Sequence, residues 1–376
     1  MRLLHTSDWH VGRKIRGRSR VGEQKAVLAE IAAIAGTESV DISVVSGDLF
    51  DVSSPSSDDE RLVYRALLDL AEVAPVAIVA GNHDGPSRLE AVRPLLELGR
   101  IVVVAAPRRP EDGGVVIFEG IGLKLALLPF VSHRSMVKVG EIMNLDPDQH
   151  HQSYEARMRR VIESLTATMG TDTVNVLASH LTAFGGVVGG GERDSHIFGY
   201  AVPPQVFPGS LTYVALGHLH RQQSIAAPTQ VWYSGSPLQL DFGEKDDSKG
   251  VLLVDADPGK PASVRQVGLE SGVPLIQLEG TLDEVLARAG EVEGAYVKVL
   301  LDEPGRAGLN DEVREAIPGA VDVVVRSVAE QRPRRSVDTS AHSPTELFRE
   351  YLKTRELDDP DVVDLFREIE QDVSVQ

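Results

Sequence analysis

The chain has 376 residues, no cysteine, and 56 acidic against 38 basic side chains, which give a formal net charge of −18. The absence of cysteine excludes a disulfide scaffold, a thiolate nucleophile and a cysteine-ligated zinc site. The negative charge argues against binding nucleic acid through general basicity, because the phosphate backbone is bound by clustered Lys and Arg. No stretch reaches the roughly 18 apolar residues of a membrane span and the first residues lack a signal-peptide pattern, so we expect a cytoplasmic, nucleoid-associated protein.

The first two thirds of the chain alternates short β-branched runs with longer amphipathic segments. The apolar runs predict buried strands at residues 3–4, 42–45, 76–80, 101–104, 125–128, 174–178, 214–216 and 251–254. Apolar residues at three- and four-residue spacing predict helices at residues 24–35, 58–70 and 154–165. This alternation is typical of a layered α/β domain, and a hairpin-like strand at 230–233 indicates mixed rather than purely parallel sheets.

The pattern resets on a smaller scale near residue 268. Strands are predicted at 274–278, 296–300 and 321–325, and helices at 281–289 and 311–317. Thr281 and Glu284 have the spacing of a capping box at the start of the first of these helices. We therefore divide the chain into a main domain over 1–268, a small α/β domain over 269–330, and a linker with a helical segment over 331–376.

The last segment predicts two short amphipathic helices that follow a linker rich in Pro, Arg and Ser. Residues 343–376 contain ten acidic and four basic side chains, for a net charge of −6. Their apolar stripes include Leu347, Phe348, Tyr351, Val363 and Phe366. Two interpretations stay open: the helices pack on the chain's own small domain, or they dock in a groove of a partner.

Five short motifs each follow a predicted strand. They are Asp8-Trp9-His10, Gly47-Asp48, Gly81-Asn82-His83-Asp84, His180, and Gly217-His218-Leu219-His220. Strand ends converge at one edge of an α/β sheet, so these side chains can meet there. Carboxylate, imidazole and amide donors suit manganese, iron or zinc, and their number fits two ions that share a bridging carboxylate. Each motif alone has an ordinary explanation as a turn, but five in this arrangement make that explanation remote.

A basic segment follows the first motif. It begins with Arg13, Lys14, Arg16 and Arg18, and residues 13–25 contain six basic side chains against one acidic, for a net charge of +5. It is either a solvated loop or a clamp on DNA phosphates beside the metal motifs. A glycine-rich stretch at 185–191 predicts a mobile loop after His180.

The order of these motifs resembles the calcineurin-like metallophosphoesterase superfamily. Within it, residues 6–12, 47–51, 81–84 and 191–193 resemble bacterial DNA nuclease subunits that act with a coiled-coil ABC-type ATPase. The resemblance implies that Asp8, His10 and His220 hold one metal ion, that Asn82, His180 and His218 hold another, and that Asp48 bridges both. It also implies that His83 faces the scissile phosphate as a catalytic residue, with Asp84 orienting its ring.

The resemblance implies a function and an assembly as well. The function would be a manganese-dependent nuclease, a 3′-to-5′ double-strand exonuclease and hairpin endonuclease, that processes DNA ends in repair, recombination and replication. The assembly would be a homodimer within a heterotetramer, with the ATPase on the C-terminal helices and the small domain capping the DNA groove. The chain has no G-x-x-x-x-G-K-[ST] motif, so ATP dependence would come from the partner.

Two alternatives remain open at this point. One is a stand-alone metallophosphoesterase that acts on a small phosphodiester or a phosphoprotein, with the same site but no need of the basic segment. The other is a non-catalytic scaffold that tethers DNA ends.

Overall fold

The computed structural model describes residues 1–132, 135–136, 139, 154–189, 201–326, 348–349, 352, 360 and 362–366. The chain divides into two compact units, Met1–Arg326 and Ser327–Gln376. The predicted linker and most of the two predicted C-terminal helices lie outside the described residues. Within the second unit the rings of Phe348 and Phe366 stack, with centroids 4.3 Å apart, so the two apolar stripes contact each other.

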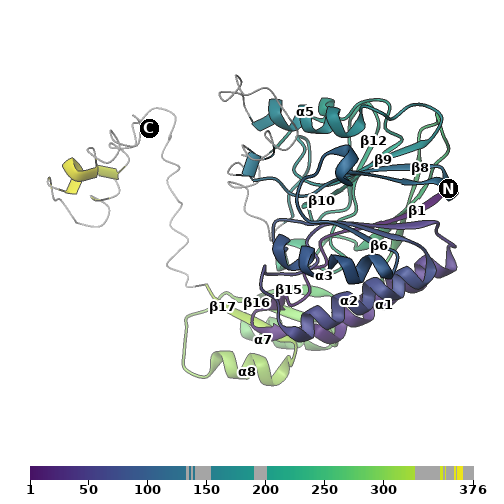
Figure 1. Cartoon of the computed structure of the whole chain (residues 1–376). Helices are drawn as coiled ribbons and strands as arrows, with labels where there is room; N and C mark the ends of the chain where they lie inside the picture. Colours follow the sequence, from purple (N-terminus) through teal and green to yellow (C-terminus); the bar gives the residue numbers. More distant parts are fainter. Residues whose placement is uncertain are drawn as a thin grey trace. The chain divides into compact units, whose positions relative to one another are not determined.

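Two mixed six-stranded sheets form the centre of the first unit (Figure 1). The first sheet has the order β14-β13-β1-β4-β5-β6, and its strands are β1 (Arg2–Thr6), β4 (Ile42–Ser46), β5 (Val76–Val79), β6 (Ile101–Val104), β13 (Gly250–Asp255) and β14 (Ser263–Gly268). The second has the order β11-β12-β10-β9-β8-β7, and its strands are β7 (Val115–Phe118), β8 (Leu123–Leu128), β9 (Val174–His180), β10 (Tyr213–Gly217), β11 (Gln223–Ile225) and β12 (Gln230–Tyr233). The prediction of mixed sheets is confirmed, since β13, β14, β7 and β11 pair antiparallel.

Successive side chains of the buried strands point to opposite faces of each sheet, so the domain has four layers: helices, sheet, sheet and helix. In β1, Leu3 belongs to the core between the two sheets, whereas Leu4 belongs to the core under the helices. Helices α1 (Val21–Thr37), α2 (Ser57–Val73) and α3 (Pro86–Leu98) cover the outer face of the first sheet. Helix α5 (Tyr154–Thr166) covers the outer face of the second (Figure 1).

The predicted strands and helices of the main domain are confirmed, and several elements were missed. Helix α3 was missed because prolines stand at its first position and inside it, and the edge strand β14 was missed because polar residues interrupt its apolar pattern. The edge strand β7 was missed although its four residues are all apolar. Short 3₁₀ turns complete the domain: η1 (Pro110–Asp112), η2 (Glu119–Ile121), η5 (Pro204–Val206) and η6 (Phe242–Glu244). None of the helices among the described residues is long and apolar enough to cross a membrane.

The small domain is a three-stranded parallel sheet with its own core. Its elements are β15 (Leu275–Gly280), α7 (Leu282–Ala287), η7 (Ala289–Val292), β16 (Tyr296–Leu301), α8 (Leu309–Ala316) and β17 (Ala320–Val325). The capping box of α7 is present, since the Thr281 amide donates to the Glu284 carboxylate at 2.8 Å and the Thr281 hydroxyl accepts from the Glu284 amide. Contacts join this sheet to the main domain in one unit, and the boundary at 268 stays a prediction.

The junction between the main domain and the small domain is formed by a basic hairpin. Strands β2 (Lys14–Ile15) and β3 (Arg18–Ser19) pair antiparallel, and Ile15 packs against Phe242 and Leu275. Arg16 donates from Nε to the Asp322 carboxylate at 2.8 Å, and Arg18 lies over the ring of Tyr296. The hairpin therefore holds the small domain through both apolar and ionic contacts.

Candidate metal centre

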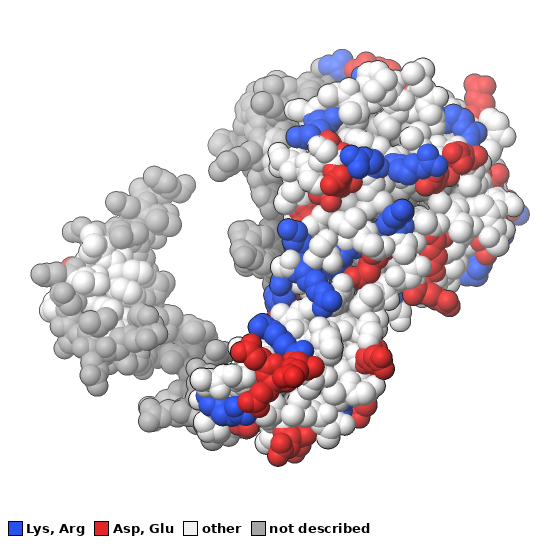
Figure 2. All heavy atoms as spheres, turned by 90° about the horizontal axis from the view of Figure 1, so that it is seen from below, with Lys and Arg blue, Asp and Glu red and all other residues white. Residues whose placement is uncertain are grey.

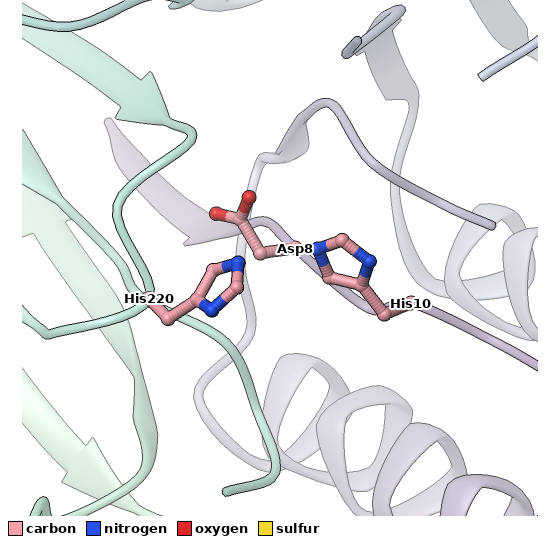
Figure 3. A group of neighbouring side chains, drawn as sticks. All are labelled: Asp8, His10 and His220. Carbon is pink, nitrogen blue, oxygen red and sulfur yellow. The ribbon is translucent and has the colours of Figure 1, made fainter. Parts of the chain in front are cut away.

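The five sequence motifs converge at the carboxyl edges of the two sheets. Asp8 and His10 follow β1, Asp48 follows β4, and Asn82 and His83 follow β5, all from the first sheet. His180 ends β9, and His218 and His220 follow β10, from the second sheet. Figure 3 shows Asp8, His10 and His220 with their polar ends directed toward a common region. The two facing sheets therefore each supply part of one site.

The backbone is strained where these side chains are presented. Asp8, His10, Asp48 and His218 all have positive φ angles, of 53°, 44°, 52° and 104°. Such angles are uncommon for residues other than glycine, and they cluster at functional sites where the surrounding fold enforces them. Here the enforcing contacts include the Asp8 amide, which donates to the Gly47 carbonyl at 2.9 Å, and the His10 amide, which donates to the Asp48 carbonyl at 3.1 Å.

The neighbouring glycines are needed mainly for space. Of Gly47, Gly81 and Gly217, which precede ligand residues, only Gly47 has a positive φ, of 90°. A Cβ on Gly81 would lie 2.1 Å from the Asp48 carboxylate, and one on Gly217 would lie 1.9 Å from the Ser46 carbonyl oxygen. These two glycines therefore let the ligand loops of different strands approach each other closely.

Asp48 lies at the centre of the site. Its Oδ2 atom is 3.5 Å from Nε2 of His10 and 3.5 Å from Nε2 of His180, while Oδ1 accepts the His83 amide at 2.8 Å. The side chain is 2% exposed. One carboxylate thus lies between two groups of possible ligands.

One of these groups contains Asn82, His180 and His218. The Asn82 Oδ1 atom is 3.0 Å from Nε2 of His180 and 2.9 Å from Nδ1 of His218, and the two ring nitrogens are 3.2 Å apart. His180 donates from Nδ1 to the Ser46 carbonyl at 2.8 Å, so Nε2 offers a lone pair to a cation once its proton is displaced. Two histidine lone pairs and an amide oxygen thus meet at one point, which is the arrangement of a metal-ligand set.

The other group contains Asp8, His10 and His220, whose ligand atoms lie within 4.8 Å of one another. His10 is 3% exposed, and neither of its ring nitrogens has a hydrogen-bond partner among the described residues. A buried polar atom without a partner costs free energy, so this ring fits a site completed by a cation. The chemistry of both donor sets therefore fits a pair of divalent metal ions.

The charges of the site act strongly on its histidines. Burial opposes a charged His180 ring, yet the adjacent Asp48 carboxylate raises the pKa of His180 to about 9. Burial, reinforced by His180, lowers the pKa of His218 to about 3. Burial also raises the pKa of Asp84 to about 7, with a further contribution from Asp48. In the absence of a cation, the proton held by the His180 ring offsets the negative charge of Asp48.

His83 is half-buried and its ring is held differently from our expectation. Nδ1 donates to the backbone carbonyl of Asp51 at 2.7 Å, which leaves Nε2 free of that contact. We expected Asp84 to orient this ring, but the Asp84 carboxylate instead accepts the amides of Gly81 at 2.8 Å and Phe50 at 3.2 Å. The reason is that Asp84 is buried beneath its loop, where it ties the ends of β4 and β5 together.

Several supporting residues were missed by sequence reasoning. Ser7 donates to the Asp8 carboxylate at 2.5 Å, and Glu244 accepts from Nδ1 of His220 at 3.0 Å. Lys249 donates to the other oxygen of Glu244 at 2.7 Å. Asp51, whose carbonyl accepts from the His83 ring, was also missed, although it lies in the stretch 47–51 that carries the family resemblance. Nothing in the sequence marks Glu244 or Lys249 as part of the site.

The basic segment is largely occupied by contacts within the chain. Arg16 pairs with Asp322, and Arg18 donates to the Pro318 carbonyl at 3.3 Å. Arg13 donates to the Asp51 carboxylate at 3.3 Å, beside the metal groups. Lys14 is exposed and forms no ion pair among the described residues. The segment is therefore neither a free loop nor a clamp presented whole to solvent.

Comparison with known proteins identifies the family of the chain. The family model for calcineurin-like phosphoesterases matches residues 1–222, and a second, described as the type 5 capsule protein repressor C-terminal domain, matches residues 271–356. A crystal structure of a dimetal phosphatase from Danio rerio covers 71% of this chain and 98% of that chain, at 12% identity and a TM-score of 0.41. Fold, site and family model define a calcineurin-like phosphoesterase, a metal-dependent hydrolase.

Two curated relatives narrow this class. The SbcD subunit of the nuclease SbcCD from Bacillus subtilis is 32% identical over 98% of this chain and 97% of its own length. The corresponding SbcD protein from Escherichia coli K12 is 30% identical over 96% of this chain and 94% of its own length. The chain belongs to the SbcD family of nuclease subunits.

Proposed function

We propose that this chain is the nuclease subunit of an SbcCD-type complex and hydrolyses phosphodiester bonds of DNA with two divalent metal ions. The observation that carries the proposal is the position of Asp48, whose Oδ2 lies 3.5 Å from the Nε2 atoms of both His10 and His180. A carboxylate between two sets of lone pairs is what a bridged two-metal site requires.

The ligands divide into two sets around that carboxylate. We assign Asp8, His10 and His220 to one ion, Asn82, His180 and His218 to the other, and Asp48 to both. Bound divalent ions would lower the pKa of a water molecule and neutralise charge on the phosphate. We propose manganese because hard oxygen donors are mixed with imidazoles here, and because the family resemblance implies it.

His83 is assigned the proton chemistry of the reaction. Its Nδ1–H is engaged by the Asp51 carbonyl, so Nε2 is the atom that can serve the substrate. When water attacks phosphorus and the bond to the sugar oxygen breaks, a protonated His83 would give its Nε2 proton to the departing oxygen. Asp84 supports this step indirectly, because it holds the Gly81 and Phe50 amides on either side of the loop.

DNA would be gripped by few basic side chains of this subunit. Lys14 is exposed, and Arg13 lies beside Asp51 at the metal edge, so both can reach a phosphate near the site. Arg16 and Arg18 can do so only by exchanging their partners in the small domain. Figure 2 shows basic and acidic side chains intermingled on one face of the molecule, which agrees with weak binding to DNA by this chain alone.

The assembly is proposed from the family and from one surface. The relatives are named as subunits of SbcCD, and we propose an SbcC-type coiled-coil ABC ATPase as the partner of the C-terminal helices. We also propose a homodimer within a heterotetramer. Leu95 and Leu98 of α3 are 70% and 85% exposed, and such apolar side chains mark a contact surface when they lie together.

The proposal is tested by a substrate comparison. A purified complex with the ATPase, and the subunit alone, would be assayed with Mn²⁺ on a hairpin oligonucleotide, on double-stranded ends labelled at the 3′ side, and on a small chromogenic diester. We expect cleavage of the hairpin and 3′-to-5′ degradation of the ends. Hydrolysis of the small diester alone would instead support a stand-alone phosphoesterase. A metal-free protein that still performed its whole role would support a non-catalytic scaffold.

A further inference from the structure

His220 is held by a buried carboxylate on the side opposite the metal group. Its Nδ1 donates to Oε1 of Glu244 at 3.0 Å, and the Glu244 side chain is 0% exposed. Since Nδ1 is used in this bond, Nε2 is the nitrogen that remains for the group formed with Asp8 and His10.

Glu244 is itself fixed from several directions. Its Oε2 accepts from the Lys249 ammonium at 2.7 Å and from the Leu240 amide at 3.1 Å. Lys249 also donates to the His220 carbonyl at 3.0 Å, so it spans both residues of the pair. Turn η6 (Phe242–Glu244), which carries the carboxylate, is capped by the Asp241 side chain and anchored by buried Phe242. The carboxylate therefore has little freedom to leave His220.

The corresponding Nδ1 atoms of His180 and His83 are held by backbone acceptors. Nδ1 of His180 donates to the Ser46 carbonyl, and Nδ1 of His83 donates to the Asp51 carbonyl. Nδ1 of His10 is 3.5 Å from the Asp51 carboxylate, beyond a good hydrogen bond. Nδ1 of His220, by contrast, donates to an anionic side chain at 3.0 Å, and an anionic acceptor makes an imidazole a stronger donor to a cation.

We propose that Glu244 is a positioning residue for His220: its carboxylate keeps the proton on Nδ1, directs Nε2 toward the metal group, and strengthens the metal position formed with Asp8 and His10. This inference rests on the proposed role of His220 as a metal ligand. It makes the two metal positions unequal, because the outer ring nitrogen of His180 at the other position donates to a neutral backbone carbonyl, that of Ser46.

The test compares Glu244→Gln with Lys249→Met in the full chain. Both substitutions remove the ion pair between Glu244 and Lys249. Glu244→Gln also removes the anion that contacts His220, whereas Lys249→Met leaves the Glu244 carboxylate on the ring. Mn²⁺ affinity and stoichiometry would be measured by calorimetric titration, the ring tautomer of His220 by ¹⁵N NMR of the metal-free protein, and folding by thermal unfolding in chelator. Glu244→Asp is a third variant, which keeps the charge but withdraws it from the ring by one methylene.

We expect Glu244→Gln and Glu244→Asp to lose about 10- to 100-fold in affinity at one of two metal positions. We expect Lys249→Met, which leaves the carboxylate on the ring, to lose clearly less affinity at that position than Glu244→Gln does, although its metal-free form melts at a lower temperature. In Glu244→Gln the single Nδ1–H tautomer of His220 should become a mixture, because an amide can donate as well as accept.

The results separate this inference from the proposed function. Unchanged affinity at both positions in Glu244→Gln would overturn the inference and leave the proposed function intact. Equal losses in Glu244→Gln and Lys249→Met would also overturn it, because the ion pair rather than the contact with His220 would then be responsible. A wild-type chain that bound no Mn²⁺ at two positions would instead contradict the proposed function.

Discussion

Two regions of this molecule carry clustered charge, and they use it in opposite ways. At the metal edge, buried carboxylates and imidazoles from two sheets point their lone pairs at one another, as the 3.2 Å separation of His180 and His218 shows. At the junction formed by the basic hairpin, each arginine has found a partner of opposite charge or an aromatic ring, as Arg16 has with Asp322. In the first region the ring nitrogens of His10 have no hydrogen-bond partner among the described residues, whereas in the second the charges of Arg16 and Asp322 are paired.

This difference indicates which region acts on a ligand and which one holds the fold together. Buried polar atoms without partners, such as the ring nitrogens of His10, are available to bind a ligand. A cluster whose charges are paired contributes mainly to the docking of the small domain. The basic segment, which we associated with DNA from its charge and its position after the first motif, thus belongs largely to the second kind.

The largest effect is expected from Asp48→Ala. Both metal positions share this carboxylate in our account, so the chain should lose both ions together. Turnover should fall by more than the roughly 10²–10³-fold that loss of one charge-stabilising group costs. Metal analysis after dialysis measures the stoichiometry, with exposed Asp255→Asn as the control. Retention of one tightly bound ion in Asp48→Ala would show that the carboxylate does not bridge.

His83→Ala should separate catalysis from metal binding. Loss of a general acid lowers turnover by about 10²–10⁴-fold, and the variant should still bind two ions because no metal is assigned to His83. Single-turnover cleavage of a hairpin oligonucleotide and metal analysis of the same sample would be compared. If the variant lost metal in step with activity, our division of roles at the metal edge would be wrong.

Phe242→Ala tests the junction. Phe242 is 3% exposed and packs with Ile15 and Leu275 between the hairpin and the small domain. Removal of a buried phenylalanine side chain costs about 3–5 kcal/mol of unfolding free energy, and chemical denaturation should show this loss. Since Phe242 anchors the turn that carries Glu244, metal affinity should fall too. A large loss of stability with unchanged metal affinity would show that the two regions are independent.

The pKa of His180, raised to about 9, predicts opposite pH trends for the two forms of the protein. A raised pKa stabilises the metal-free fold below the ordinary value of 6.5, and that stability is lost as the pH rises toward 9. Metal binding must displace the proton, so affinity at this position should rise by about tenfold per pH unit up to pH 9. Calorimetry in buffers of different ionisation enthalpy would measure the released proton, and its absence at about pH 7 would contradict the trend.

The smallest effect concerns the hairpin and DNA. Lys14→Ala should reduce the slope of log DNA affinity against log salt concentration by about one, because one phosphate contact is lost. Arg18→Ala should change it less, since Arg18 already donates to the Pro318 carbonyl and lies over Tyr296. Fluorescence anisotropy at several salt concentrations compares the two variants. If the two variants changed the salt dependence equally, Arg18 would have to leave its partners in the small domain and contact DNA.

The sequence predicted the metal edge well because strand ends determine it. Apolar β-branched runs located β1, β4, β5, β9 and β10, and polar residues just after buried strands meet wherever parallel strands end together. The partners of Arg16 and Arg18 could not be predicted, since Asp322 and Tyr296 lie about 300 residues away in the chain and their approach depends on how the small domain docks. Glu244 lies only 24 residues from His220 and was missed for a different reason, since nothing in its sequence surroundings marks it as a partner of that ring.

The central claim is that Asp48 bridges two metal positions with separate ligand sets. A crystal of the protein soaked in Mn²⁺, with anomalous diffraction collected at the manganese edge, tests this most directly. We predict two anomalous peaks on either side of Asp48, one against Asp8, His10 and His220 and one against Asn82, His180 and His218. A single peak, or two peaks that do not share Asp48, would contradict the account.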